Sequence, residues 1–565
     1  MEVAPHLSLA HEFSLILARI CPVARMIRIG KGMPMRPAAA ECDQLQPMTC
    51  SASGVDASAT RSRWLPTTDR TYVIIALCLI AALSLLLPIQ PEDFWWNMAL
   101  GRATWQAGRI PSVDTFSYTQ PGEPIFVQGW LPQILFYLLY SVGGAVLIAL
   151  IQAVVLAGTY GLLLLLCVKR GARPALAAIV LLAIAVPLSA SNWNVRPQSY
   201  VLVLFVLMLM ALHRWQRLNE ASFSAAFWKG RLWALPLLML LWVNMHGSFV
   251  LGGGLIALTF MAESMRRVLK QWRPDWMQRD ALAGSHASLA ALFVAGVLAA
   301  AVIPLNPTGF GIIRFTLTCA RDPDRRVNSV EWRPPVVTEA DGPYFFAAVV
   351  GVIVVLVLAR RRPSLIDLFQ MAAFFWLGLQ GVRYIVWFAL VLVPILADIL
   401  GRPPGPQEER TAPDRFPVHL VLVALAAGLV IAFLPLLKPL WLPGRNGNLL
   451  SVDTPVAAVH ALDDLSPRPR RLFHSSSAGS YLMWAAPEQG IFIDSRLQDF
   501  YKPKLVADYC TLTAGERVRE LVAEYRIDGM LLSREQHGRL IEVMMSLADW
   551  SEAYADATHL IFVRK

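Results

Sequence analysis

Two adjacent carboxylates, Glu92 and Asp93, stand where the chain leaves a long apolar run, TYVIIALCLIAALSLLLPI, that ends at Ile89. They are followed by Trp95 and Trp96, whose rings are expected at the headgroup level of a membrane. Anchoring needs no acidic pair at that depth, and a carboxylate there can act as a general base toward an acceptor hydroxyl. The plainer alternative is a solvated acid at a helix end. A further acid in the same loop, Asp114, favours the functional interpretation.

Three other polar residues stand at the ends of apolar segments and could bind an anion. Arg196 and Gln198 open a span directly after SASNWNV, and Arg383 lies in LQGVRYIVWF at the outer end of another span. A guanidinium there could hold phosphate oxygens. The alternative is that the arginine side chains only reach from a helix end toward water.

His246 and Asn244 interrupt an apolar stretch of some thirty residues in VNMHGSFVLGGG. Polar side chains in such a stretch face the interior of a helix bundle, where they pair or line a cavity. A structural hydrogen bond and a substrate cavity are both compatible with this position.

The composition is that of a membrane protein. The chain has 565 residues, 56% of them hydrophobic and 16% charged, with a mean hydropathy of +0.49. Soluble proteins are about one quarter charged. The net charge of +10 is concentrated in short loops, which favours contact with membrane lipids over nucleic acid. The seven cysteines show no metal-ligand or redox spacing. The sequence has no Walker A, HExxH or GxSxG motif, so it gives no support to an ATP-driven pump or a metalloprotease.

Several apolar runs approach the roughly 20 residues that a helix needs to cross a bilayer. We expect about eleven spans, near 71–89, 143–167, 174–190, 198–213, 233–246, 248–263, 287–304, 343–359, 364–379, 384–400 and 418–437. The segment WLPQILFYLLYSVGG, before the second span, is typical of an interfacial helix.

Lys and Arg predict the orientation, because cytoplasmic loops carry an excess of them. Every second loop is basic, which places the N-terminus in the cytoplasm and residues 90–130, 305–342 and the C-terminal region on the outer face. The 305–342 loop breaks the rule. Either the spans around it are miscounted, or its arginines meet lipid-linked phosphate. These arginines are Arg314, Arg321, Arg325, Arg326 and Arg333.

Three regions follow from these patterns. Residues 1–70 read as a disordered cytoplasmic tail, 71–443 as the transmembrane domain, and 444–565 as a small extracytoplasmic α/β domain able to fold alone. In the last region, RRLFHSSS, GIFIDSR, IDGMLLS and THLIFVRK read as strands, whereas LVADYCTLTAGERVRELVAEY and EQHGRLIEVMMSLADW read as helices.

Several motifs together resemble a bacterial family of multispan membrane proteins related to the GT-C glycosyltransferases. The family pattern begins with an acidic-aromatic motif like D-x-D-F-W-W-H-L, matched here from Glu92 to Met98, and continues with a stretch like G-R-I-P-x-x-D-x-F-S-Y-T. Further matches are RPQ, W-x-N-x-H-G, N-P-x-G, E-W at Glu331 and Trp332, and F-I-D-S-R at Phe492 to Arg496. The resemblance covers nearly everything from residue 70 onward. It departs at Asn97, where the pattern has His, and at Gly129, where an acid is expected.

The resemblance implies a GT-C-like bundle in the bacterial cytoplasmic (inner) membrane. It also implies transfer of a sugar from a polyprenyl-phosphate donor to a glycan, lipid or protein acceptor on the outer face. By that resemblance Asp93 would be the base, with Glu92 as its alternate, and Asp114 would position or polarise. Arg196 and Arg383 would neutralise the departing phosphate.

Trp95, Trp96, Gln198 and His246 complete the expected substrate-binding set. No protein metal site is expected, and no cofactor is certain, although a divalent cation stays open. The alternative function is a non-catalytic membrane transporter, or an envelope-assembly scaffold whose outer domain binds a partner.

Overall fold

The computed structural model describes residues 67–565 except 219, 273–284, 322–328, 340, 402–415 and 443–446. The predicted tail, 1–70, therefore lies almost entirely outside the described residues. Seven helical segments are long and apolar enough to cross a membrane. They are α2 (Thr68–Leu86), α4 (Trp130–Lys169), α5 to η2 (Pro174–Asn192), α7 (Pro197–Arg217), α10 (Phe249–Trp272), α11 with η4 (His286–Leu305) and η6 with α16 (Val382–Leu400).

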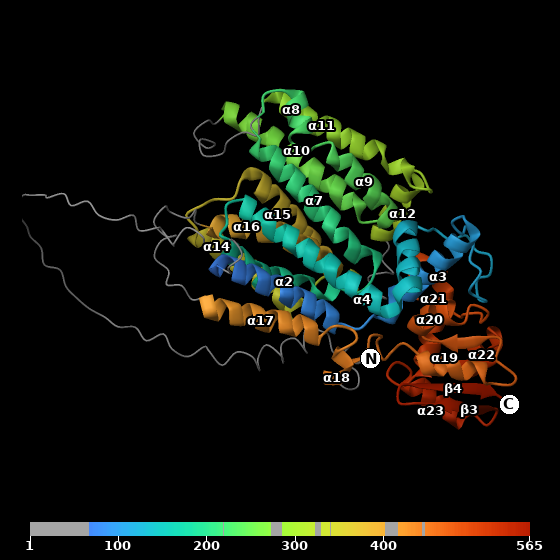
Figure 1. Ribbon diagram of the computed structural model, residues 1–565. Helices are drawn as coiled ribbons and strands as arrows, with labels where there is room; N and C mark the ends of the chain where they lie inside the picture. The colour runs from blue at the N-terminus through green and yellow to red at the C-terminus, as the bar shows by residue number, and fades with distance from the viewer. Residues whose placement is uncertain are drawn as a thin grey trace, which may run out of the picture.

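Four shorter apolar helices account for the rest of the predicted spans. These are α9 (Ala234–Met245), α14 (Gly342–Leu358), α15 (Leu365–Gln380) and α17 (Phe416–Ala432). Each predicted span thus coincides with one apolar helix or helical segment. The fold is a polytopic α-helical bundle with a small C-terminal α/β unit, as the sequence predicts (Figure 1).

A kink within α4 lies at the start of the second predicted span. Gly143 and Gly144 leave helical geometry, and Gly144 has a φ of +58°, a conformation that glycine adopts without steric cost. The residues before this kink form the separate helix that the sequence predicts, and the residues after it form the span.

Helix α16 lies at the centre of the bundle, and almost all of its side chains are buried. Trp387 on this helix packs against Phe205 of α7, with ring centroids 5.1 Å apart, and against Trp242 of α9 at 5.8 Å. Burial of such large rings contributes much of the core energy of a bundle. These contacts pack α7, α9 and α16 against one another.

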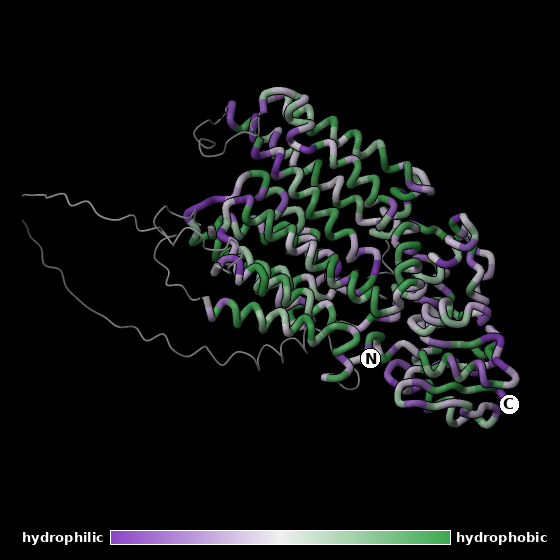
Figure 2. The backbone as a smooth tube through the Cα atoms, viewed as in Figure 1, coloured by the Kyte–Doolittle hydropathy of each residue, from purple (hydrophilic) through white to green (hydrophobic). Residues whose placement is uncertain are grey.

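The polar residues gather at the two ends of the bundle, and the hydrophobic ones along its helices (Figure 2). At one end, Arg170 after α4 contacts Asp367 in the first turn of α15 at 2.8 Å and Asp398 near the end of α16 at 3.4 Å. Arg170 belongs to the basic loop 169–173, and Arg361 of the basic segment 360–362 contacts the same Asp398 at 3.7 Å.

The other end carries α3 (Pro91–Ala107), the loop after it, and the C-terminal unit (Figure 1). Short helices join the longer ones. They are α8 (Phe223–Trp228), α12 (Gly311–Arg321), η5 (Val330–Trp332) and α18 (Lys438–Trp441).

The C-terminal unit is a four-stranded mixed sheet with helices. Its strands lie in the order β1-β2-β4-β3, with β1 parallel to β2 and the other pairs antiparallel. The strands are β1 (Leu472–His474), β2 (Gly529–Ser533), β3 (Trp550–Ala555) and β4 (His559–Arg564). The helices are α19 (Val456–Asp463), α20 (Ser476–Ala485), η9 (Leu497–Asp499), α21 (Pro503–Thr513), α22 (Val518–Glu524) and α23 (Gly538–Ser546).

Two details of this unit differ from the prediction. The segment GIFIDSR is not a strand of the sheet, and only Ile491 makes a single bridge, to Ser117 of the outer loop. The strand β3 occupies residues expected to be at the end of a helix and in a loop, because WSEAYA pairs with β4 rather than continuing α23. Both differences arise from long-range pairing, which no local pattern encodes.

The C-terminal unit packs closely on α3. Trp95 of α3 is buried against Tyr481 and Trp484 of α20, with ring centroids at 4.9 and 6.4 Å, and Arg102 lies over the Trp484 ring at 4.5 Å. Independent folding of the C-terminal unit stays a prediction. An isolated fragment would expose the apolar surface that these contacts cover.

Candidate functional site

Arg196 is the centre of a charged cluster at the end of the bundle that carries the C-terminal unit. It precedes Pro197 at the start of α7, and its extended backbone (φ −152°, ψ 158°) is the one that a following proline favours. The buried guanidinium donates from Nη1 to Glu331 Oε1 at 2.6 Å and from Nη2 to Asn192 Oδ1 at 3.1 Å. Asp93 Oδ2 lies 3.8 Å from the same Nη1. Residues from three distant parts of the chain therefore meet at one side chain.

Asp93 comes from the first turn of α3, which begins at Pro91, a residue suited to the first helical position. Its Oδ1 accepts a bond of 3.3 Å from Trp96 Nε1, and 39% of its side chain is exposed. The surrounding protein limits its hydration and raises the pKa of Asp93, and Arg196 opposes this shift. A carboxylate that is both accessible and more basic than usual is suited to accept a proton.

Glu331 is the partner of Arg196 that the sequence-based site did not include. It lies in η5, with 40% of its side chain exposed. Desolvation alone would raise the pKa of Glu331, but Arg196 and Arg383 outweigh it and hold the pKa below its usual value. Glu331 is therefore the charged partner that stabilises Arg196. The E-W motif was the only signal for it in the sequence.

Arg383 is the second guanidinium of the cluster, at the start of the last central segment. It donates to Gln198 Oε1 at 3.1 Å and lies over the Trp332 ring at 4.2 Å. Gln198 in turn donates to Asn192 Oδ1 at 3.1 Å. Among the described residues, no carboxylate comes within ion-pair distance of Arg383. Its charge is held by an amide and an aromatic face, which leaves donors for an anion.

His246 interacts electrostatically with the guanidiniums of Arg383 and Arg196. Its Nδ1 accepts from the Ser248 backbone N–H at 3.1 Å, so the proton of the neutral ring belongs on Nε2. Desolvation, Arg383 and Arg196 lower the pKa of His246 to about 3. His246 is therefore neutral and cannot bind a phosphate as a cation. Asn244, which lies near it in the sequence, accepts a hydrogen bond from Trp130 Nε1 at 2.8 Å and so has a structural role.

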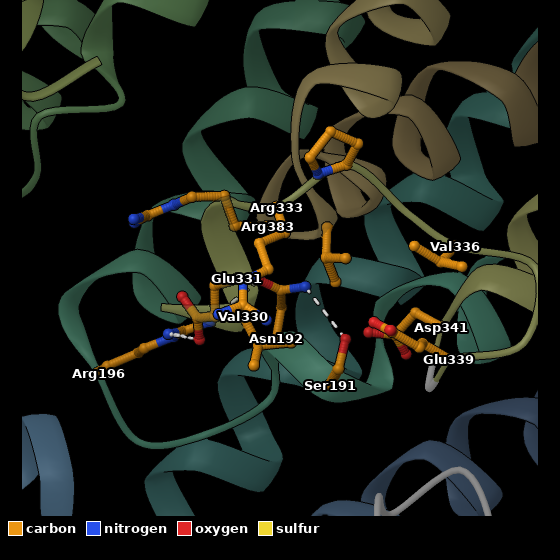
Figure 3. A pocket seen from close by; sticks show the side chains of 12 residues that line it. Ser191, Asn192, Arg196, Val330, Glu331, Arg333, Val336, Glu339, Asp341 and Arg383 are labelled. Atoms are coloured by element: carbon orange, nitrogen blue, oxygen red, sulfur yellow. Dashed lines mark hydrogen bonds and ion pairs between the residues drawn. The ribbon is translucent and has the colours of Figure 1, made fainter. Parts of the chain in front are cut away.

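A cavity of about 110 Å³ adjoins the cluster (Figure 3). Arg196 and Glu331 lie on one side of it in this view, and Glu339 and Asp341 on the other. The lining residues are Ser191, Asn192, Arg196, Val330, Glu331, Arg333, Pro334, Val336, Glu339, Asp341, Val382 and Arg383. Of the arginines predicted in the 305–342 loop, Arg333 lines this cavity. Arg314 and Arg321 line a shallow surface groove on α12.

Arg325 and Arg326 lie outside the described residues. An apolar helix lies on each side of this loop, α11 before it and α14 after it, but α14 is one of the shorter helices, so both explanations of the arginines stay predictions.

Three residues of the predicted site lie outside this cluster. Asp114 is buried and accepts a bond of 2.8 Å from Arg496 of the C-terminal unit, so it does not position or polarise Asp93 directly. Trp95 is buried between α3 and α20 and is not free to contact a substrate. Glu92 is exposed, yet the surrounding protein limits its hydration and raises its pKa to about 7.

The two departures from the family pattern have local physical reasons. At Gly129 an added Cβ would come within 2.6 Å of the Met245 carbonyl oxygen, so no acid fits this backbone. Asn97 is buried one helical turn after Asp93 and donates to the Asp93 carbonyl at 2.7 Å. The departures at Asn97 and Gly129 therefore take no functional side chain away from the Arg196 cluster.

Within the described part of the chain, no group of three or more His, Cys, Asp or Glu could hold a metal ion.

No family model matches the sequence, and no curated protein matches it. The structure is similar to that of the oligosaccharyltransferase AglB from Archaeoglobus fulgidus, with a TM-score of 0.45, 14% identity, and coverage of 87% of this chain and 74% of that one. It is also similar to ArnT from Cupriavidus metallidurans bound to undecaprenyl phosphate, with a TM-score of 0.46, 12% identity, and coverage of 88% and 98%.

A third similar structure is the arabinofuranosyltransferase AftD from Mycobacteria, with a TM-score of 0.47, 13% identity, and coverage of 87% and 41%. These proteins are GT-C glycosyltransferases, the superfamily that the sequence resembles.

Proposed function

We propose that this protein is a membrane glycosyltransferase that moves a sugar from a polyprenyl-phosphate donor to an acceptor hydroxyl at the outer face of the cytoplasmic membrane. The observation that carries the proposal is the accessible carboxylate of Asp93 beside the guanidiniums of Arg196 and Arg383. A general base next to anion-binding donors is what displacement of a phosphate leaving group requires.

In the proposed step, the acceptor oxygen forms a bond to the anomeric carbon of the donor sugar while its proton passes to Asp93. The bond between the anomeric carbon and the phosphate oxygen breaks, and polyprenyl phosphate leaves with the electron pair. Arg383 stabilises the new negative charge, since none of the described carboxylates lies within ion-pair distance of it. Arg196, neutralised by Glu331, orients Asp93 and contributes less to the leaving group.

The test separates binding from turnover. The whole protein in lipid nanodiscs is offered a panel of synthetic polyprenyl-phosphate monosaccharides, and release of polyprenyl phosphate is followed by mass spectrometry. Binding of polyprenyl phosphate itself is measured in parallel. We expect both binding and release, and Arg383→Gln should weaken binding about tenfold, as for loss of one charge-assisted contact of about 1.5 kcal/mol.

Binding without release for every donor and acceptor offered would contradict the proposal and favour the scaffold. The same protein in liposomes tests transport. Movement of the intact donor across the liposome bilayer, without bond cleavage, would favour the transporter.

The sidedness of the site belongs to the same proposal. Its support is the row of basic loops at the opposite end of the bundle. Reporter fusions after Arg402 and after Gly444 should report opposite sides of the membrane. If both report the same side, α17 does not span and the site does not face outward.

A further inference from the structure

Two adjacent residues of the C-terminal unit, Ser495 and Arg496, contact the α3 region. In the first contact, Ser495 Oγ donates to the main-chain carbonyl oxygen of Glu92, in the first turn of α3. In the second, Arg496 Nη2 donates to Asp114 Oδ1 in the outer loop, at 2.8 Å. Neighbouring residues of one segment thus hold both the start of α3 and the loop that follows it.

The contact of Ser495 bears directly on Asp93. The Glu92 carbonyl and the Asp93 amide belong to one planar peptide unit, so fixing the carbonyl also fixes the axis about which Asp93 can turn. A carbonyl has no proton, which makes Ser495 the donor in this bond. Ser495 is itself held from behind, because its backbone N–H donates to Ser480 Oγ at 3.2 Å and the two hydroxyls lie 2.8 Å apart.

The second contact is rigid because both side chains are buried and the Asp114 carboxylate accepts hydrogen bonds through both of its oxygens. The Arg496 and Asp114 side chains are 6% and 0% exposed. Arg496 also donates to both carboxylate oxygens of Asp494, from Nε at 2.8 Å and from Nη2 at 2.6 Å. Asp114 accepts from the Ser117 backbone N–H at 2.8 Å, which closes a turn of the outer loop.

We propose that the C-terminal unit sets the position of the proposed base, with Ser495 as a positioning residue for Asp93 and Arg496 as the fixed point behind it. This inference rests on the proposed function for its effect on turnover. Its mechanical part, that Ser495 orders the first turn of α3, is independent of any reaction. A misplacement of about 1 Å at a reacting group is enough to lower a rate strongly.

The test compares Ser495→Ala with Ser495→Thr, which keeps the hydroxyl, in the full-length protein in nanodiscs. Ser546→Ala is the control, because Ser546 is exposed on α23 and bonds only within its own helix. We expect Ser495→Ala to lower kcat about tenfold with little change in KM, and Ser495→Thr to restore most of it. The acidic limb of the pH–rate profile should also move to higher pH in Ser495→Ala, since Asp93 would lie less close to Arg196.

Amide hydrogen exchange over residues 90–97 gives a readout that needs no turnover. Ser495→Ala should exchange faster there, whereas Ser546→Ala should match the unchanged protein. Unchanged exchange in Ser495→Ala overturns the inference, and so does faster exchange with undiminished kcat and an unshifted pH profile. If the unaltered protein turns over no donor, the proposed function fails, and the exchange result alone decides whether Ser495 orders α3.

Discussion

Arg196 and Arg496 each lie between two carboxylates, but only one of these clusters reaches water. Beside Arg196, the side chains of Asp93 and Glu331 are 39% and 40% exposed. Beside Arg496, both carboxylates are 0% exposed. Each cluster places one guanidinium between two carboxylates, with one ion pair of 2.6 Å in each, so charge alone does not separate a reactive site from a structural one.

The number of hydrogen bonds at each carboxylate makes the difference. Asp494 accepts from the Arg496 side chain, from its backbone N–H at 2.9 Å, and from Tyr501 Oη at 2.7 Å. From the part of the chain that the structure describes, Asp93 accepts a single hydrogen bond, of 3.3 Å from Trp96, besides its longer contact with Arg196. An incompletely bonded carboxylate keeps lone pairs for a substrate proton, whereas a saturated one holds the chain in place.

Asp93→Asn is the most direct test of whether the Arg196 cluster is a reactive site. This change keeps the shape and removes the charge, so we expect turnover to fall about a hundredfold to ten-thousandfold, the usual contribution of a general base. Thermal unfolding in detergent should change little, because the side chain is partly exposed. Full turnover in Asp93→Asn would mean that another group accepts the proton and that Asp93 is not the general base.

Arg496→Met should have its main effect on folding. It leaves two buried carboxylates without their cation, which costs about 3–5 kcal/mol when one partner of a buried ion pair is removed. Chemical denaturation in micelles measures this loss. Arg496→Lys, which keeps the charge but not the planar fork, should recover part of it. A protein as stable as the original would show that the Asp114 contact is dispensable.

The two clusters should also respond to acid over different ranges of pH. The pKa of Asp93 is raised, and catalysis needs its ionised form, so turnover should fall as the pH drops through a value above the ordinary 3.8. The pKa of Asp494 is lowered, so its contribution to stability is present above its unfolded pKa of about 3.9 and is lost only as the pH falls below it. Rates and melting temperatures measured across the same pH series should therefore separate, with activity lost first. Coincident loss of both would mean that the acidic limb reports unfolding.

The smallest effect is expected for Glu92→Gln. Glu92 touches the C-terminal unit through its main-chain oxygen, which the substitution leaves in place, and its side chain is exposed. Turnover should change by no more than about twofold, as at other exposed positions. Because the pKa of Glu92 is raised to about 7, the shape of the pH–rate profile is the stricter check. Disappearance of an acidic limb near pH 7 in this variant would transfer the role of base from Asp93 to Glu92.

The sequence by itself determined the membrane-spanning framework. Apolar runs predict helices because a bilayer leaves the backbone no partner except itself. The same local logic predicted an interfacial helix joined to the second span, and the acidic start of α3 next to its tryptophans. It also singled out Arg196, Gln198 and Arg383, since polar residues at the ends of apolar runs can be recognised from the sequence alone.

The partners of these residues were decided by the tertiary structure. Glu331 lies 135 positions from Arg196, and Arg496 lies 382 positions from Asp114, so neither pairing leaves a periodic or local trace. Asp93 and Asp114 look alike in the sequence, as two acids of one outer loop. Only the packing of the C-terminal unit against α3 buries Asp114 in an ion pair with Arg496 and leaves Asp93 partly exposed beside Arg196, because hydration and hydrogen-bond number depend on what the fold brings from elsewhere in the chain.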